Sequence, residues 1–120
     1  MPKSEINRSQ IKNPFPPMNS VTYQNSWSSY NDGYAPAAYY KDAMGVVHIE
    51  GLIRGGTAGQ AAFTLPAGFR PGYRQIYACL NAANTVVNRV DVYTNGQVVP
   101  QSGVNNGWIT LSDITFVAEG

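Results

Sequence analysis

The chain has 120 residues, a formal net charge of +1 and only 12% charged residues, about half the share typical of soluble domains. This length suits one domain with one core, and the balanced charge favours neither nucleic acid nor an anionic membrane as a partner. The single cysteine, Cys79, excludes a disulfide within the chain, and its apolar neighbours predict a buried thiol.

Residues 1–20 are expected to form an extended arm or linker. Pro14, Pro16 and Pro17 favour extended backbone, because each proline fixes its own φ and restricts the preceding residue. Both a disordered tail and an ordered arm on a neighbouring subunit or larger assembly remain open. The segment lacks the apolar core of a signal peptide, and no apolar run approaches the roughly 20 residues of a membrane helix. We therefore expect neither secretion by the usual routes nor membrane insertion.

Residues 21–120 carry the pattern of an all-β domain, in which turn residues separate short apolar runs. The first strand is expected at residues 21–24 and a tight turn at residues 31–33. Residues 38–42 and 46–53 are expected to pair as a hairpin. Other strands are expected at residues 61–65, 75–80, 86–94, 97–101, 108–111 and 114–117.

Alternation within residues 46–53 predicts one core face and one mixed face. Val47, Ile49 and Ile53 share the apolar face, whereas His48 and Glu50 belong to the mixed face. A mixed face suits a surface that is covered only in part, as at a subunit contact.

Two turns have strong hairpin chemistry. Asn95 and Gly96 predict a type I′ turn, which needs positive φ at both central residues. Residues 105–107 form a second turn signal of similar chemistry. No segment has helical periodicity beyond one or two turns, so we predict an antiparallel β-sandwich.

Motifs of enzyme chemistry are mostly absent. The sequence has no nucleophile elbow and no phosphate-binding loop, and the His48-x-Glu50 spacing lacks the cysteine pair of zinc deaminases. His48 is interpreted as structural, with a place near a subunit contact or on a metal at a symmetry axis left open. The acids of the domain are scattered and single out no pair for glycoside hydrolysis. We therefore expect no catalytic residue, no metal and no cofactor.

A cluster of aromatic residues is the best candidate for a binding surface. Trp27, Tyr30 and Tyr34 lie among Asn, Ser and Asp32, and exposed rings can stack on a sugar while polar neighbours bond its hydroxyls. Alternatively, Trp27 and Tyr34 plug the end of the sandwich. Trp108 is expected in the core. Single-stranded nucleic acid would need a basic groove that this charge balance does not supply.

About four fifths of the chain resembles a domain found at the C-termini of bacteriophage and prophage tail-fibre and minor tail proteins. The matching pieces are QNSW (24–27), GYAPAAYYKD (33–42), GVVHIEGLI (45–53), FTLPAGFRP (63–71), RVDV (89–92), NGQV (95–98), NGWITL (106–111) and ITF (114–116).

The resemblance implies a jelly-roll-like β-sandwich tip, assembled as a homotrimer, that binds a receptor at the distal end of a fibre. It implies a virion protein made in the host cytoplasm, with a bacterial surface glycan or protein as partner and no catalytic motif. His48 and Glu50 are the candidates for the trimer interface. Members of the family usually follow a long shaft, so this chain is expected to be either an excised tip or a short virion protein that docks on other virion proteins through its arm.

The leading interpretation is a non-catalytic receptor-binding module whose ligand contacts include Trp27, Tyr30, Asp32 and Tyr34. The alternative is a structural protein that decorates a capsid or baseplate and binds no host molecule.

Overall fold

A computed structural model of the protein describes residues 17–83, 87–101 and 106–119. The expected arm lies outside these ranges except for its last four residues. Within them the protein is all-β, as predicted, with antiparallel pairing throughout and no helix. The strands are β1 (Asn19–Ser20), β2 (Ser28–Ser29), β3 (Ala38–Lys41), β4 (Val46–Glu50), β5 (Leu52–Arg54), β6 (Phe63–Thr64), β7 (Gln75–Leu80), β8 (Val87–Val92), β9 (Gln97–Pro100), β10 (Ile109–Thr110) and β11 (Ile114–Val117).

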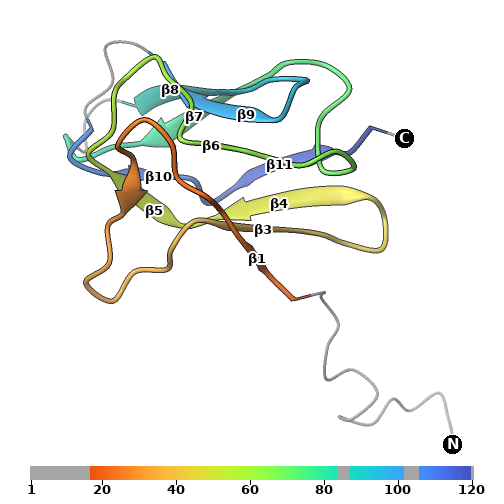
Figure 1. Ribbon diagram of the computed structural model, residues 1–120, viewed down its shortest axis with the longest axis horizontal. Coiled ribbons are helices and arrows are strands. Elements are labelled where there is room, and N and C mark those ends of the chain that lie inside the picture. Colours follow the sequence, from red (N-terminus) through yellow and green to blue (C-terminus); the bar gives the residue numbers. More distant parts are fainter. Residues whose placement is uncertain (1–16, 84–86, 102–105, 120) are drawn as a thin grey trace, which may run out of the picture.

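The strands form two layers, consistent with a β-sandwich (Figure 1). One layer has the order β6-β9-β8-β7. The other combines the sheets β1-β3-β4-β11 and β10-β5-β2, which follow one another because only Gly51 separates β4 from β5. Isolated bridges from Pro71 to Ala118 and from Asn81 to Ile109 join the layers at their edges. The jelly-roll connectivity stays a prediction.

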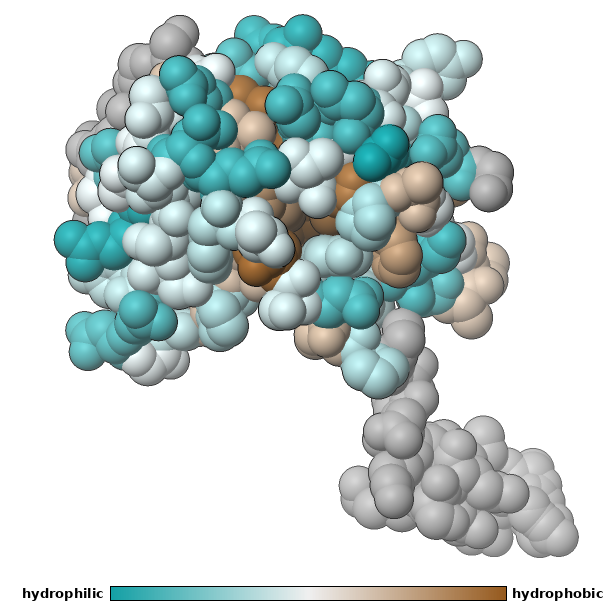
Figure 2. Space-filling model, in the orientation of Figure 1, coloured by the Kyte–Doolittle hydropathy of each residue, from teal (hydrophilic) through white to brown (hydrophobic). Residues whose placement is uncertain are grey.

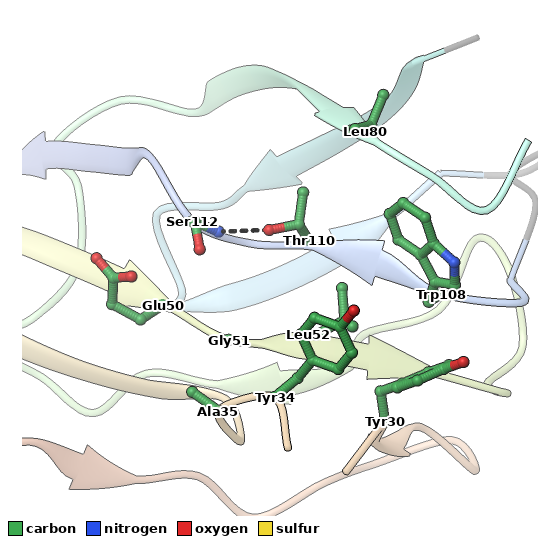
Figure 3. A pocket seen from close by; sticks show the side chains of 10 residues that line it. All are labelled: Tyr30, Tyr34, Ala35, Glu50, Gly51, Leu52, Leu80, Trp108, Thr110 and Ser112. Atoms are coloured by element: carbon green, nitrogen blue, oxygen red, sulfur yellow. Dashed lines mark hydrogen bonds between the residues drawn. The ribbon is translucent and has the colours of Figure 1, made fainter. Parts of the chain in front are cut away.

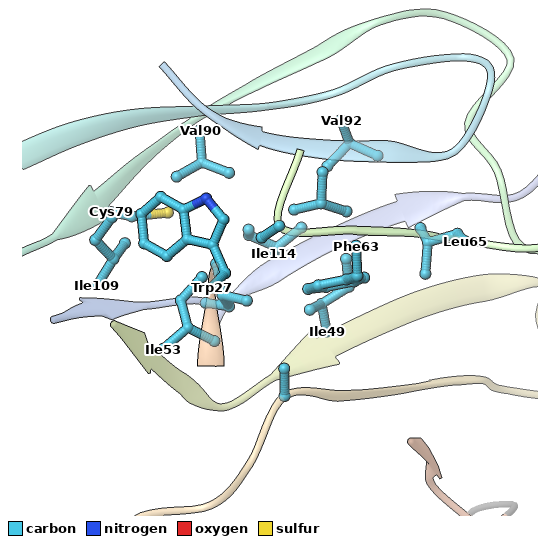
Figure 4. Close-up of a cluster of buried hydrophobic side chains, with 14 of the residues drawn as sticks. Trp27, Ile49, Ile53, Phe63, Leu65, Cys79, Val90, Val92, Ile109 and Ile114 are labelled. Carbon is cyan, nitrogen blue, oxygen red and sulfur yellow. The ribbon is translucent and has the colours of Figure 1, made fainter. Parts of the chain in front are cut away.

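The core fills the space between the layers (Figure 4). Val47, Ile49 and Ile53 are fully buried, which confirms the predicted apolar face of this segment. Side chains of the opposite layer, among them Val90 and Val92, meet them from the other side. Cys79 is buried in the same cluster, as expected. Burying such aliphatic side chains supplies about 1.5–3 kcal/mol each, which makes this cluster the main source of stability.

Two hairpins use the same three-residue connection. The predicted hairpin of β3 and β4 is confirmed, and its turn bonds Gly45 N to Asp42 O and Asp42 N to Val46 O. The β8–β9 hairpin repeats this pattern, with Gly96 N donating to Tyr93 O. Only Gly96 of its turn has positive φ, so the predicted type I′ turn is wrong. A type I turn followed by a left-handed glycine closes a three-residue hairpin loop equally well.

The type I′ pattern occurs instead at the turn predicted for residues 31–33. Tyr34 N donates to Asn31 O, and both central residues have positive φ, 55° at Asp32 and 88° at Gly33. Asn31 itself has a φ of 67°. The chain thus reverses sharply between two tyrosines. The turn signal at residues 105–107 lies partly outside the described residues.

The strand expected at residues 21–24 is wrong. This segment crosses from one layer toward the other. The evidence is the bond that Gln24 N donates to Ala62 O, which lies beside β6 in the opposite layer. A segment between layers cannot join a ladder in either sheet. The short strand β1 lies just before it, at the end of the expected arm, and pairs with β3.

Gly51 marks a bend that no other residue could form as easily. Its φ is +119°, and a Cβ at this position would lie 2.5 Å from Pro36 O and 2.6 Å from Ala37 Cα. Leu52 N donates to Ala35 O, and Leu111 N donates to Gly51 O. The backbone of residues 35–37 therefore lies directly against the bend.

Gly51→Ala is expected to destabilise the fold by at least about 3 kcal/mol, because strained backbone and a clash with backbone atoms add together. Gly45→Ala is the matched control, since Gly45 also has positive φ but open space around it. It should cost only about 1–2 kcal/mol. Urea unfolding of both variants measures the difference, and equal losses would show that the close passage does not matter.

Candidate functional site

A pocket of about 340 Å³ opens on the outer face of the β10-β5-β2 sheet (Figure 3). This volume falls in the range of small-molecule sites. Leu52 and Thr110 are register partners on β5 and β10 and form part of its lining. They face outward because their neighbours Ile53 and Ile109 are fully buried in the core. Strand alternation thus supplies the pocket floor.

Two tyrosines flank the pocket because the turn at residues 31–33 lies between them. Tyr30 N donates to Leu52 O, which holds the start of the turn against the pocket floor. The rings of Tyr30 and Tyr34 meet edge to face, with centroids 5.7 Å apart and an interplanar angle of 78°. The guanidinium group of Arg54 lies over the Tyr30 ring, with its Cζ 5.3 Å from the ring centroid. These contacts orient both rings without covering Tyr34, which is 59% exposed.

Trp108 lines the same pocket, which corrects its expected place in the core. It is half-buried and lies at the same end of the pocket as Tyr30 (Figure 3). The residue precedes β10 on the outward phase of the alternation, since the following residue, Ile109, is buried. The position of Trp108 next to the apolar Ile109, on the opposite face of the strand, was the signal in the sequence that could have placed Trp108 on the surface.

Glu50 lines the opposite end of the pocket, near Ser112 (Figure 3). It was expected at a trimer interface because it belongs to the mixed face of its strand. The structure brings it together with Tyr30 and Tyr34 at one concave site, and its place at a trimer interface stays a prediction. Leu80, from the end of β7, contributes an aliphatic wall. Neither Glu50 nor Leu80 was a candidate ligand contact from sequence.

Asp32 and Trp27 do not join this site. Asp32 is exposed at the tip of the turn and does not line the pocket. Trp27 is 2% exposed within the core, where its Nε1 donates to Thr57 O at 3.3 Å (Figure 4). A Cβ on Gly56 would overlap its ring, so the indole lies flat against that glycine. Trp27 is therefore a core residue, which corrects its inclusion among the ligand contacts.

His48 belongs to a separate cluster on the outer face of β3 and β4. Its ring stacks on Tyr40 with centroids 4.6 Å apart, and its Nε2 lies 2.8 Å from Asp42 Oδ2. Asp42 also accepts from Met44 N and Val46 N in the turn. Its bond with His48, with help from these amides, lowers the pKa of Asp42 below its usual range. This arrangement braces the hairpin.

Asp91 is a fully buried carboxylate held by two arginines. Arg74 Nε lies 2.7 Å from Asp91 Oδ2, and Arg89 Nε lies 2.8 Å from Asp91 Oδ1. Burial by itself raises the pKa of Asp91, but the bonds from Arg89 and Arg74 outweigh it and hold the pKa below the usual range. This carboxylate is committed to structure.

Cys79 offers no nucleophile at neutral pH. Burial, together with the charge of Asp113, raises the pKa of its thiol to about 12, and the reactive form of cysteine is the thiolate.

Among the described residues no group of three or more His, Cys, Asp and Glu side chains could hold a metal ion. Across the same residues, no helix is long and apolar enough to span a membrane.

Comparison with known proteins identifies one informative structural likeness. The structure superimposes with a TM-score of 0.71 on the crystal structure of the receptor binding protein (gp15) of Listeria phage PSA. The match covers 94% of this chain and 71% of that one, at 15% sequence identity. The chain shares the fold of a phage receptor binding protein. No family model matches the sequence, and no curated protein matches it significantly.

Trp27→Ala is expected to lower the free energy of unfolding by about 3–5 kcal/mol, because it leaves a large cavity in the core. Tyr34→Ala should change it by less than about 1 kcal/mol, since the ring is mostly exposed. Denaturant unfolding followed by circular dichroism measures both. A Trp27→Ala protein of undiminished stability would contradict the core assignment.

Proposed function

We propose that this protein is a non-catalytic receptor-binding module of a bacteriophage virion, which attaches to a molecule on the bacterial surface. The observation that carries the proposal is a pocket lined by aromatic side chains on a fold shared with a phage receptor binding protein. Fold alone does not imply function, so the pocket has to supply the chemistry.

A surface glycan is the ligand that the pocket suits best. Tyr30, Tyr34 and Trp108 can stack on the apolar face of a sugar, while Glu50 can accept bonds from its hydroxyls. The visible surface around the domain is mostly polar, with apolar side chains exposed chiefly in its hollows (Figure 2). Such a surface favours many hydrogen bonds and few ionic contacts.

The pocket also favours binding over hydrolysis. Glycoside hydrolysis generally uses two carboxylates across one scissile bond. Glu50 is the one carboxylate that lines the pocket within the described part of the chain. Asp42 and Asp91 are committed to the pairs described above.

We further propose that the protein acts as a homotrimer on an external appendage of the virion, joined to other virion proteins through residues 1–20. Exposed Ile76 and Val87 lie on the neighbouring strands β7 and β8 and form an apolar surface that association would bury. A cyclic trimer joins two different surfaces of each subunit, and the outer face of β4 at His48 is the second candidate. Glu50 is assigned to the pocket instead. Three weak sites on one particle can raise overall affinity about 10²- to 10⁴-fold.

The second candidate function is structural decoration of a capsid or baseplate. The N-terminal segment favours it, since a proline-rich arm can dock a small domain on a larger assembly. In that case residues 1–20 carry the essential contact and the pocket is not used.

Binding of the fluorescently labelled protein to whole bacterial cells tests the leading proposal. Tyr34→Ala should weaken binding roughly tenfold, because central aromatic contacts contribute over 1 kcal/mol each. Tyr73→Ala is the matched control, since Tyr73 is 81% exposed and lies outside the pocket. It should leave binding unchanged.

Equal effects of the two tyrosine substitutions would remove the pocket from the proposal. The structural function is favoured if incorporation into virions requires residues 1–20 and the free domain shows no detectable binding to host cells.

Light scattering at micromolar concentration is expected to give three times the 13.0 kDa mass of the chain. Ile76→Lys should shift the mass to that of a monomer, because it places a charge in the buried apolar contact. A wild-type mass of 13.0 kDa would exclude the trimer. His48→Ala with unchanged mass and thermal stability would exclude His48 from the interface.

A further inference from the structure

Glu50 has no charged or hydrogen-bonding partner among the described residues, in contrast to Asp42 and Asp91. Asp42 is paired with His48, and Asp91 is held by two arginines. The Glu50 side chain forms no ion pair or hydrogen bond with another described residue, yet it is half-buried in the lining of the pocket. Removing a carboxylate partly from water without a partner is costly. A ligand that supplies a positive charge would offset this cost.

Charges around the pocket favour such a ligand. No lysine or arginine is among the described residues that line it, so Glu50 is the one charged side chain of that lining. Arg54 contacts Tyr30 but does not line the pocket. A uronate or phosphate placed near Glu50 would be repelled, because like charges at close range in a partly buried site interact strongly.

Aromatic rings at the other end of the pocket point to the same chemistry. Tyr30 and Trp108 lie together opposite Glu50, and Tyr34 lies between the two ends (Figure 3). The faces of tyrosine and tryptophan rings attract cations and also stack on sugar rings. A cationic saccharide would thus make favourable contacts along the whole pocket, whereas a neutral one would leave the carboxylate without an ionic partner.

We propose that the pocket recognises a saccharide that carries a protonated amine, with the ammonium group on Glu50 and the sugar face on Tyr34 and its neighbours. This inference rests on the proposed attachment function and names the class of glycan that the site would take. It assigns Glu50 as the residue that selects an amino sugar over its N-acetylated counterpart.

Titration of the protein with two trisaccharides, followed by nuclear magnetic resonance, tests the inference. The probes are the trimer of glucosamine, whose amines are protonated at pH 6, and the neutral trimer of N-acetylglucosamine. We expect the glucosamine trimer to bind about tenfold more tightly, the size of one charge-assisted contact. Glu50→Gln should remove this preference by weakening binding of the glucosamine trimer about tenfold more than binding of the neutral trimer.

Glu119→Gln is the matched control, because Glu119 is exposed and lies outside the pocket. It removes the same charge and should leave the preference intact. Circular dichroism of the Glu50→Gln protein checks its fold. If Glu50→Gln does not fold, Glu50→Asp replaces it, and it should weaken the preference because the carboxylate is drawn back from the pocket.

The outcomes separate this inference from the proposed function. Equal binding of both trimers, no binding of the glucosamine trimer, or a preference that survives Glu50→Gln overturns the inference, and cell binding that depends on Tyr34 would leave attachment standing. Conversely, a preference that depends on Glu50, in a protein that binds no host cells, supports the ligand class and counts against host attachment.

Discussion

The backbone of residues 35–37 passes directly over Gly51, and the layer that contains β4 and β5 depends on this contact. With φ at +119° and Pro36 O at 2.5 Å from any Cβ, only glycine fits without displacing the neighbouring chain. The bend ends the pairing of β3 with β4 and lets β5 pair with β2 and β10. Leu52 then accepts the bond from Tyr30 N that positions the aromatic turn. The backbone conformation of one glycine thus fixes the floor and the rim of the pocket together.

Two tryptophans of similar sequence character end in opposite environments. Trp27 is enclosed between the layers and fills the space over Gly56, whereas Trp108 stands on the outer face of β10. Strand alternation beside the buried Ile109 turns Trp108 outward, whereas Trp27 is enclosed by residues distant in the chain, among them Gly56 and Thr57. Acidic residues divide in the same way, because Asp91 is paired with Arg89 on its own strand and with Arg74 just before β7, while Glu50 lines the pocket. Residues of the same type therefore hold the fold together in one place and line the pocket in another.

The sequence was a good guide wherever local rules decide. Alternation placed Val47 and Ile49 in the core, and glycine at the third loop position closed two hairpins where they were expected. It was a poor guide at residues 21–24, which have the composition of a strand but cross between layers. It also misassigned the turn at Gly96, because a type I′ turn and a three-residue loop use the same residues.

By itself, the sequence determined the all-β class, the hairpins and the faces of the strands, since the period-two alternation and the φ preferences of glycine act over a few residues. It also placed Tyr30 and Tyr34 on either side of a sharp turn. Only the tertiary structure decided that these rings meet Trp108 and Glu50 around one pocket. These residues are up to 78 positions apart in the chain, and their meeting depends on the bend at Gly51 and on strand pairing across the sheet, which no local pattern encodes.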